Sequence, residues 1–488
     1  MGVLIRERVA YKDGGKPGKY ASTAEFITTW AGVNGTLAQA CAAYGVGYPG
    51  IAGQQYYCDG VGLTIIGRPL PANICSIGDS IASFNVDLGI GANYPNAASE
   101  GFLTWFNNLR YGAHYIQNVA ASGAVIGDVT DNVGNTATTQ IYNLKSLALK
   151  PKAVFLSIGA NDFYALSYTA KQVIANLHGL LAEFTALNID CYFLNGFPRE
   201  NSTVGSNVYS APKQAEQLAF LQLLPDLFSK YNRHKLLDVY SIASSTGDIT
   251  GGAASGWTYD GLHPNQKYAK AIGEYLHIVL PVSENLIYPS LISDQDISGV
   301  VGGRSKNVSA RSTMSAYSNG VGVPAGFSED IKTNCTSVIQ IQNNTHGGAY
   351  KEIQITLTFS AAGSYLLSNI ETGALITDTD KWVSTGKVSL DSDANSIVKH
   401  VYLRGRCEGA TLKMAYGGYA RGTAAAPGVM PSVAPFSNKF VCTAIGSSAG
   451  SSTGFRNSIG VDTTGAGTVV ITVSELAMFR MPAIVNYS

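Results

Sequence analysis

Four short motifs in this chain carry residue types that can do chemistry together. The segment Gly78-Asp79-Ser80 follows an apolar run, and Asp260 lies three residues before His263. A serine hydroxyl becomes a good nucleophile when a histidine takes its proton, and a carboxylate fixes the tautomer of that histidine. These residues therefore predict a nucleophile, a base and an acid that orients the base.

The two other motifs contain groups that can stabilise a negative charge. Asn161 follows the apolar run of residues 153–158, and an amide at the end of a strand can donate to a developing oxyanion. Gly123 follows Ser122 after another such run, and a glycine lets a backbone N–H approach the same point. Each motif alone also fits an ordinary turn. Their combination predicts an oxyanion hole beside a nucleophile.

The hydrophobic pattern of residues 71–281 indicates the elements that position these motifs. Apolar runs alternate with amphipathic helical stretches, which is typical of βαβ units around a parallel sheet. The expected strands are residues 74–77, 115–119, 153–158, 189–194 and 235–239, and the expected helices are residues 99–113, 170–187, 211–232 and 265–280. This predicts a flavodoxin-like, doubly wound α/β domain with a parallel five-stranded sheet, in which the four motifs meet at the carboxyl edge.

The C-terminal region has a different pattern, with period-two alternation and Gly/Ser clusters in place of helical stretches. It predicts an all-β sandwich or jelly-roll domain over residues 336–488, with a carbohydrate-binding or oligomerisation role. The expected strands are residues 353–359, 365–370, 400–404, 411–416, 439–445 and 469–473. Residues 282–335 are expected to be a linker, and residues 1–70 an N-terminal connector region.

The four motifs, in this order, resemble the sequence blocks of the SGNH hydrolases, also called GDSL esterases. The resemblance covers residues 74–281, and Ile81 stands where the GDSL pattern has leucine. It implies an SGNH hydrolase domain with Ser80 as nucleophile, His263 as base and then acid, and Asp260 as its orienting partner.

The same resemblance implies how the oxyanion would be held. Its donors would be the backbone N–H groups of Ser80 and Gly123 and the side-chain amide of Asn161. Asp162, the next residue, is expected to cap a helix or to hold the active-site loop. The resemblance implies neither a metal nor an organic cofactor.

Five further residues near the motifs are candidates for substrate binding: Phe163, Tyr164, Arg199, Trp257 and Tyr259. Phe163 and Tyr164 either line the site or pack in the core. Arg199 fits either an anionic group of a substrate or a surface ion pair. Trp257 and Tyr259 fit a wall on which a sugar ring stacks.

Composition excludes several classes of function. Lys and Arg number 33 and Asp and Glu number 33, so the chain lacks the basic charge of proteins that bind nucleic acid or anionic membranes. Hydrophobic residues make up 45% and aromatic residues 10%, which excludes a disordered chain. No apolar run reaches the roughly 18 residues of a membrane span, so no membrane insertion is expected. Seven scattered cysteines predict neither a disulfide scaffold nor a zinc site.

The substrate and setting follow from the β-domain and from composition. The chain is rich in Gly and Tyr and only 14% charged, and in this it resembles viral tail proteins that bind glycans. We expect an esterase that removes O-acetyl groups from O-antigen or capsule, similar to bacteriophage tailspike deacetylases. It would be a homotrimer of the virion tail that acts at the host cell surface, with its N-terminal region facing other tail proteins. The first residues lack a signal-peptide pattern, as expected for a protein released by lysis.

Two alternatives remain open at this point. One is a free, extracellular carbohydrate esterase of bacterial origin. The other, from a different class, is a glycan-binding adhesin whose hydrolase domain is catalytically silent.

Overall fold

The structure is a computed structural model of the chain, which divides into two compact units, residues 1–70 with 274–286 and residues 71–273 with 287–488. The structure describes residues 3–6, 9–12, 55–58, 63–66, 70–71, 73–83, 101–110, 114–130, 139–147, 150–199, 210–258, 260–280, 306–307, 317–346, 351–372, 381–408, 413–420, 436–443, 446–447 and 454–481.

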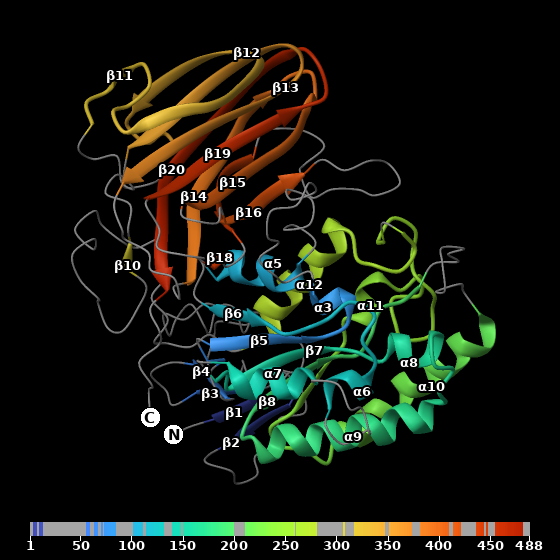
Figure 1. Ribbon diagram of the computed structural model, residues 1–488. Coiled ribbons are helices and arrows are strands. Elements are labelled where there is room, and N and C mark those ends of the chain that lie inside the picture. Colours follow the sequence, from blue (N-terminus) through green and yellow to red (C-terminus); the bar gives the residue numbers. More distant parts are fainter. Residues whose placement is uncertain are drawn as a thin grey trace. The chain divides into compact units, whose positions relative to one another are not determined.

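The first unit contains a small antiparallel sheet. Its strands run in the order β2-β1-β3-β4 (Figure 1). They are β1 (Val3–Arg6), β2 (Val9–Lys12), β3 (Gln55–Cys58) and β4 (Leu63–Ile66). The role of residues 1–70 as a connector stays a prediction.

The α/β domain is built on a parallel sheet with the strand order β6-β5-β7-β8-β9, as the sequence predicted (Figure 1). The strands are β5 (Asn73–Gly78), β6 (Tyr115–Asn118), β7 (Ala153–Ser157), β8 (Asp190–Leu194) and β9 (Lys235–Leu237). Because the order reverses at β5, the carboxyl ends of β5, β6 and β7 form the edge where ligands bind in such sheets.

Helices cover both faces of this sheet. The longer ones are α5 (Phe102–Leu109), α9 (Ala170–Ala186), α10 (Ala211–Phe228) and α12 (Gln266–Val279), which confirm the four predicted helices. The shorter ones are α3 (Ser80–Ser83), α6 (Ile126–Val129), α7 (Gln140–Ser146), α8 (Ala160–Tyr164) and α11 (Tyr240–Ala243). No helix among the described residues is long and apolar enough to cross a membrane.

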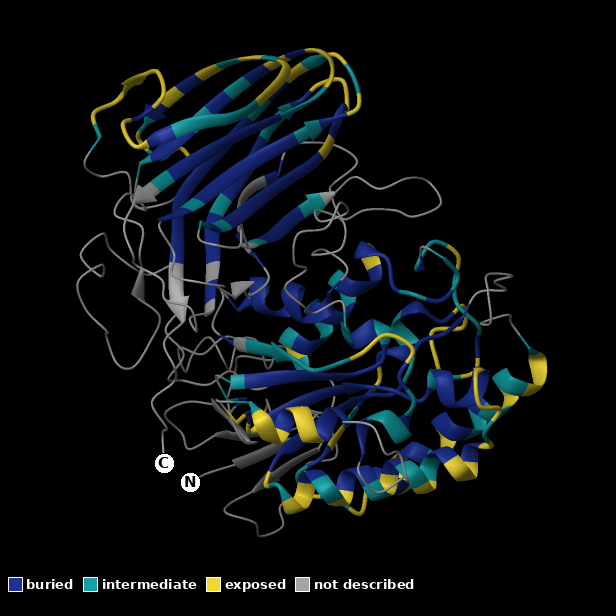
Figure 2. Cartoon of the chain, in the orientation of Figure 1, coloured by how far each residue is buried: buried dark blue, intermediate teal, exposed yellow. Residues whose placement is uncertain are grey.

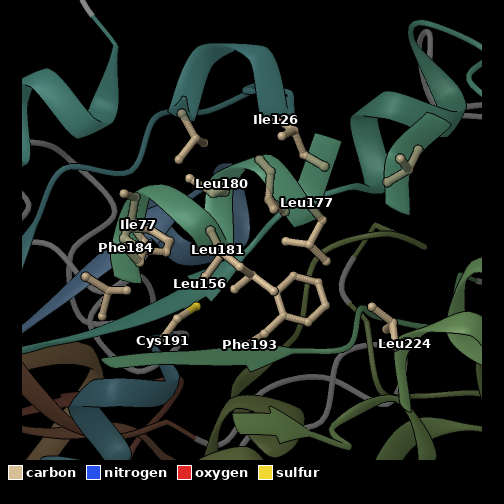
Figure 3. Packing of buried hydrophobic residues seen from close by; sticks show 14 of the residues in the cluster. Ile77, Ile126, Leu156, Leu177, Leu180, Leu181, Phe184, Cys191, Phe193 and Leu224 are labelled. Atoms are coloured by element: carbon tan, nitrogen blue, oxygen red, sulfur yellow. The ribbon is translucent and has the colours of Figure 1, made fainter. Parts of the chain in front are cut away.

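The parallel strands are apolar on both faces because each face packs against helices. Ile77, Leu156 and Phe193 lie on the side of α9, where Leu177 and Leu181 meet them (Figure 3). On the other side, the ring of Phe155 lies 6.1 Å from that of Phe106 in α5. Figure 2 shows β7 and β8 as buried throughout, while β6 is of intermediate exposure and α9 and α10 expose their outer faces. The sheet is therefore a rigid support for residues at its edge.

The C-terminal domain is an antiparallel β-sandwich, as predicted. Its strands form one continuous sheet with the order β16-β15-β19-β13-β20-β14-β17, to which β12 adds through β13. The long strands are β12 (Phe327–Gln342), β13 (Glu352–Thr372), β14 (Lys381–Asp393), β15 (Val398–Glu408), β16 (Lys413–Ala420), β17 (Phe436–Cys442), β19 (Gly454–Thr463) and β20 (Gly467–Met481). Three short strands complete it: β10 (Lys306–Asn307), β11 (Gly320–Val321) and β18 (Gly446–Ser447).

The sheet closes over its own core. Gly405 in β15 packs against Trp382 in β14, although these two strands are not paired by hydrogen bonds. Two layers therefore face each other across a core to which every long strand except β16 contributes buried apolar side chains, including Ile355, Val401 and Ile471.

The β-domain differs from the sequence prediction in its strands and in its start. The strands β14 and β19 were not among the expected strands. The runs 353–359 and 365–370 belong to a single strand, β13, which pairs first with β20 and then with β19. In addition, β12 begins at Phe327 and β11 at Gly320, inside the predicted linker 282–335. The predicted domain start at residue 336 is therefore too late, because two bulges in β12 break the alternation that would have marked this strand.

Candidate active site

Ser80 stands at a tight turn from β5 into α3. Gly78 adopts a φ of +130°, and a Cβ atom there would lie 1.8 Å from the carbonyl oxygen of Ser157 in β7. Only glycine fits this conformation and this close approach. The turn brings the Ser80 hydroxyl to the carboxyl edge of the sheet, as the sequence predicted.

Gln140, at the start of α7, holds the same turn and was missed by the sequence analysis. Its side chain accepts a hydrogen bond of 2.8 Å from the Gly78 N–H and donates one of 2.7 Å to the Gly78 carbonyl. Both groups are buried, so the pairing satisfies a strand end that would otherwise lack partners. Gln140 lies 62 residues from Gly78 and in no motif, so no sequence signal pointed to it.

Asp260 and His263 form a compact turn before α12. One carboxylate oxygen, Oδ1, accepts from the backbone N–H groups of Leu262 (2.9 Å) and His263 (2.7 Å). The other, Oδ2, lies 2.7 Å from His263 Nδ1. Burial alone would raise the pKa of Asp260, but the hydrogen bonds from His263 and the turn hold it below its ordinary value. Asp260 is therefore an ionised acceptor that fixes the imidazole.

The other nitrogen of this imidazole reaches Ser80. His263 Nε2 lies 2.8 Å from Ser80 Oγ, although the two residues are 183 positions apart. The imidazole is only 17% exposed. With its Nδ1 proton held by Asp260, the neutral ring presents an acceptor at Nε2, which is what a general base for a serine hydroxyl needs.

Two of the predicted oxyanion donors lie on segments that follow β6 and β7. Gly123 has a φ of +78°, is exposed, and has no neighbouring heavy atom within 4 Å of a Cβ position. Asn161, in α8, donates from its amide nitrogen to the carbonyl of Ala124 at 2.9 Å. This bond ties α8 to the loop of Gly123, and the amide nitrogen carries a second N–H.

Asp79, between the turn glycine and the serine, is fully buried. Its carboxylate accepts from the Ile81 N–H at 3.0 Å and so fixes the first turn of α3. Burial raises the pKa of Asp79 to about 6, against the opposing effect of the Ile81 hydrogen bond and of the nearby His263 and Arg199 side chains.

Asp162 holds the active-site loop, as predicted. Both carboxylate oxygens lie 3.2 Å from the Ile126 N–H at the start of α6. Burial raises the pKa of Asp162 to about 7 despite this hydrogen bond, and the charges of Asp79 and Asp128 add to the rise.

The raised pKa of Asp162 makes the free energy of unfolding depend on pH. A carboxyl with a pKa of 3.8 when unfolded and about 7 when folded contributes stability below pH 4, and this contribution is lost as the pH rises to 7. We expect the unfolding free energy of the wild type to fall relative to Asp162→Asn by roughly 1.4 kcal/mol per pH unit across that interval. Urea unfolding at several pH values measures the difference. Asp226→Asn, on the exposed side of α10, should show no such slope, and a flat difference for Asp162→Asn would refute the assignment.

The predicted substrate-binding residues have different environments in the structure. Phe163 is 1% exposed and packs edge-on against Phe220, so it belongs to the core. Tyr164 is also buried, and its ring lies under the guanidinium of Arg199. Arg199 is 5% exposed, so the predicted surface ion pair is wrong. Tyr259 lies outside the described residues.

Trp257 lies on the same loop as the candidate acid and base. Its carbonyl accepts from the Asn265 N–H at 3.1 Å, which closes the loop around Asp260 and His263. The ring is partly buried, with Lys267 4.1 Å from its centroid. Trp257 is therefore fixed on the loop that carries Asp260 and His263, and its role in substrate binding stays a prediction. The described residues contain no group of three side chains suited to hold a metal ion.

Comparison with known proteins gives a family for this domain. Residues 76–271 match the GDSL-like lipase/acylhydrolase family, which covers the α/β domain and all four motifs. A carbohydrate acetylesterase from Sinorhizobium meliloti is 12% identical over 42% of this chain and 97% of that chain, with a TM-score of 0.32. An α/β hydrolase enzyme from the metagenome of Lake Arreo, Spain, is 19% identical over 43% of this chain and 96% of that chain, with a TM-score of 0.31. No curated protein matches the sequence.

The family match agrees with the arrangement of serine, histidine and carboxylate at the edge of the sheet. Over residues 76–271 the α/β domain is similar to the GDSL-like acylhydrolases, and the protein is a carboxylic ester hydrolase.

Proposed function

We propose that this ester hydrolase removes O-acetyl groups from a polysaccharide, with Ser80, His263 and Asp260 as its catalytic triad. The observation that carries the proposal is the pair of hydrogen bonds from Asp260 through His263 to Ser80, of 2.7 Å and 2.8 Å. The choice of a carbohydrate substrate rests on the β-sandwich joined to the hydrolase domain and on Trp257, a partly exposed aromatic residue three positions before Asp260.

The first half of the reaction forms an acetyl-enzyme. Ser80 Oγ attacks the carbonyl carbon of the acetyl group while its proton passes to His263 Nε2. The negative charge that develops on the carbonyl oxygen is held by the N–H groups of Ser80 and Gly123 and by the Asn161 amide. The tetrahedral intermediate then collapses, and His263 returns the proton to the departing sugar oxygen.

The second half releases acetate. Water gives a proton to His263 Nε2 and attacks the acetyl-Ser80 carbonyl through the same oxyanion hole. When this intermediate collapses, the proton returns to Ser80 Oγ and acetic acid leaves. In both halves Asp260 stays ionised and stabilises the imidazolium, as its lowered pKa requires.

The oxyanion role of Asn161 predicts a specific loss. We expect Asn161→Ala to lower kcat for p-nitrophenyl acetate by about 10²–10³-fold, because one charge-stabilising donor is removed. KM should change little, since the donor acts mainly on the transition state. Asn143→Ala, on the exposed side of α7, is the matched control. Unchanged kcat in Asn161→Ala would remove this residue from the oxyanion hole.

The substrate class is tested by acetate release. Purified O-acetylated O-antigens and capsular polysaccharides are incubated with the wild-type protein and with Ser80→Ala, and acetate is measured by a coupled assay. Release that requires Ser80 supports the proposal. Hydrolysis of p-nitrophenyl acetate without release from any polysaccharide would keep the serine mechanism and discard the substrate.

We propose a bacteriophage tailspike as the biological setting, acting at the host cell surface as a homotrimer of the virion tail. The support is the chain composition, with 54 glycines and only 14% charged residues. Light scattering on the full chain tests it: a trimer supports a tailspike, and a monomer supports a free esterase. Binding to polysaccharide without acetate release would favour an adhesin.

A further inference from the structure

Arg199 is an enclosed cation at the carboxyl edge of the sheet. It follows β8 by a few residues, and its backbone carbonyl accepts from the Ala253 N–H at 3.2 Å. The residue is 5% exposed. Its guanidinium lies over the ring of Tyr164, 3.6 Å from the centroid. Backbone and side chain are thus both held in place.

The donors of this guanidinium have no acceptor among the described residues. Nε and both terminal nitrogens are buried, and no described protein atom lies within hydrogen-bond distance and geometry of them. The side chain stays charged because the pKa of arginine is very high even when burial lowers it. Enclosing a charge without hydrogen bonds is costly, and stacking on Tyr164 offsets only part of that cost.

The nearby carboxylates do not accept hydrogen bonds from the Arg199 guanidinium. Asp79 and Asp260 lie within electrostatic range of Arg199, but neither is hydrogen-bonded to it. Asp260 uses its oxygens for His263 and the turn, and Asp79 binds the Ile81 N–H. By contrast Arg404, a buried arginine of the β-domain, pairs with Asp330 at 3.3 Å. Arg199 therefore has donors to spare beside the triad.

The position of Arg199 connects it to the reacting ester. Tyr164, on which it lies, is three residues after Asn161 in α8, so the two side chains share one face of that helix. A group bound to Arg199 would thus lie next to the oxyanion hole. Because the guanidinium is buried, a charge-assisted hydrogen bond there is stronger than at the surface.

We infer that Arg199 binds a carboxylate of the substrate, so that the protein acts on O-acetylated acidic sugars such as hexuronates. The planar guanidinium matches a carboxylate with two parallel hydrogen bonds. A monoanion fits better than a phosphate dianion, because Asp79 and Asp260 already place negative charge nearby. The inference rests on the proposed acetylesterase function and adds a substrate class to it.

The test compares two substrates that differ only in the charge of one group. One is the methyl glycoside of glucuronic acid with every remaining hydroxyl group acetylated. The other is the methyl ester of the same compound. We expect the wild type to prefer the acid by roughly 10- to 100-fold in kcat/KM, as the loss of a charged hydrogen bond predicts. Arg199→Met should abolish the preference, and Arg199→Lys should keep a smaller one because the charge remains without the planar fork.

The matched control is Arg233→Met. Arg233 is bonded to Asp190 at 2.8 Å, at the amino end of β8 and therefore at the opposite edge of the sheet. This variant should keep the full preference for the acid. Equal wild-type rates on the acid and its ester, or a preference that persists in Arg199→Met, would overturn the inference. If Arg199→Met does not fold, the wild type and Arg199→Lys decide.

Failure of the inference is distinguishable from failure of the proposed function. If neither compound releases acetate, both are titrated into Ser80→Ala by calorimetry. Tighter binding of the acid that weakens on adding Arg199→Lys and is lost on adding Arg199→Met supports the carboxylate site even though the proposed reaction has failed. Equal binding of the two compounds, or none, overturns it. Release that persists in Ser80→Ala refutes the triad alone.

Discussion

Replacing Ser80 by alanine is expected to lower kcat for p-nitrophenyl acetate by about 10⁴–10⁶-fold. Among the described residues, His263 Nε2 is the acceptor for the proton of the Ser80 hydroxyl, at 2.8 Å. Removing this hydroxyl leaves His263 and Asp260 without a nucleophile to activate. The remaining rate should reflect the oxyanion donors and binding alone. Stopped-flow and long-time absorbance assays together cover this range.

The control for this variant is Ser229→Ala, at the exposed end of α10, which should keep wild-type kinetics. Thermal melting should be nearly the same for all three proteins, because Ser80 is partly exposed and its side chain fills no core position. If Ser80→Ala keeps more than a few per cent of the wild-type rate, another residue must be the nucleophile.

Gly78→Ala is expected to destabilise the α/β domain by about 3 kcal/mol or more. The added Cβ would meet the Ser157 carbonyl at 1.8 Å, a backbone atom of the adjacent strand that cannot move without breaking the sheet. The φ of +130° adds strain for any residue with a side chain. Urea unfolding, followed by loss of esterase activity, measures the change.

Gly247→Ala separates the two causes. Gly247 also has a positive φ, of +73°, but has no neighbouring heavy atom within 4 Å of a Cβ position. It should cost only the strain, about 1–2 kcal/mol. Equal effects of the two substitutions would show that the close approach to Ser157 is unimportant.

The sequence predicted the α/β domain well because its signals are local. Each parallel strand is a short apolar run that must be covered on both faces, and Gly78, Gly123 and Gly159 mark the turns after β5, β6 and β7. Because parallel strands end at one edge, the order of the motifs along the chain was enough to bring Ser80 and His263 together.

The parts that could not be predicted depend on contacts between distant residues. Gln140 acts only through its pairing with Gly78, and a lone glutamine at a helix start carries no signal. Two bulges in β14 interrupt the alternation of inward- and outward-facing side chains that would mark it as a strand. In β19, Asn457 is buried because it donates to the Ala477 carbonyl at 2.6 Å, so the strand looks too polar to lie inside a sandwich.

The separation of 183 positions between Ser80 and His263 has a consequence for how activity returns after unfolding. The strands β5, β6 and β7 can pair while the chain beyond them is still unfolded, since they close shorter loops. The contact between nucleophile and base forms only when the whole of this high-contact-order domain has closed. In refolding from urea, the circular dichroism signal of the secondary structure should therefore recover before esterase activity does. The return of activity then measures the rate of the last step of folding.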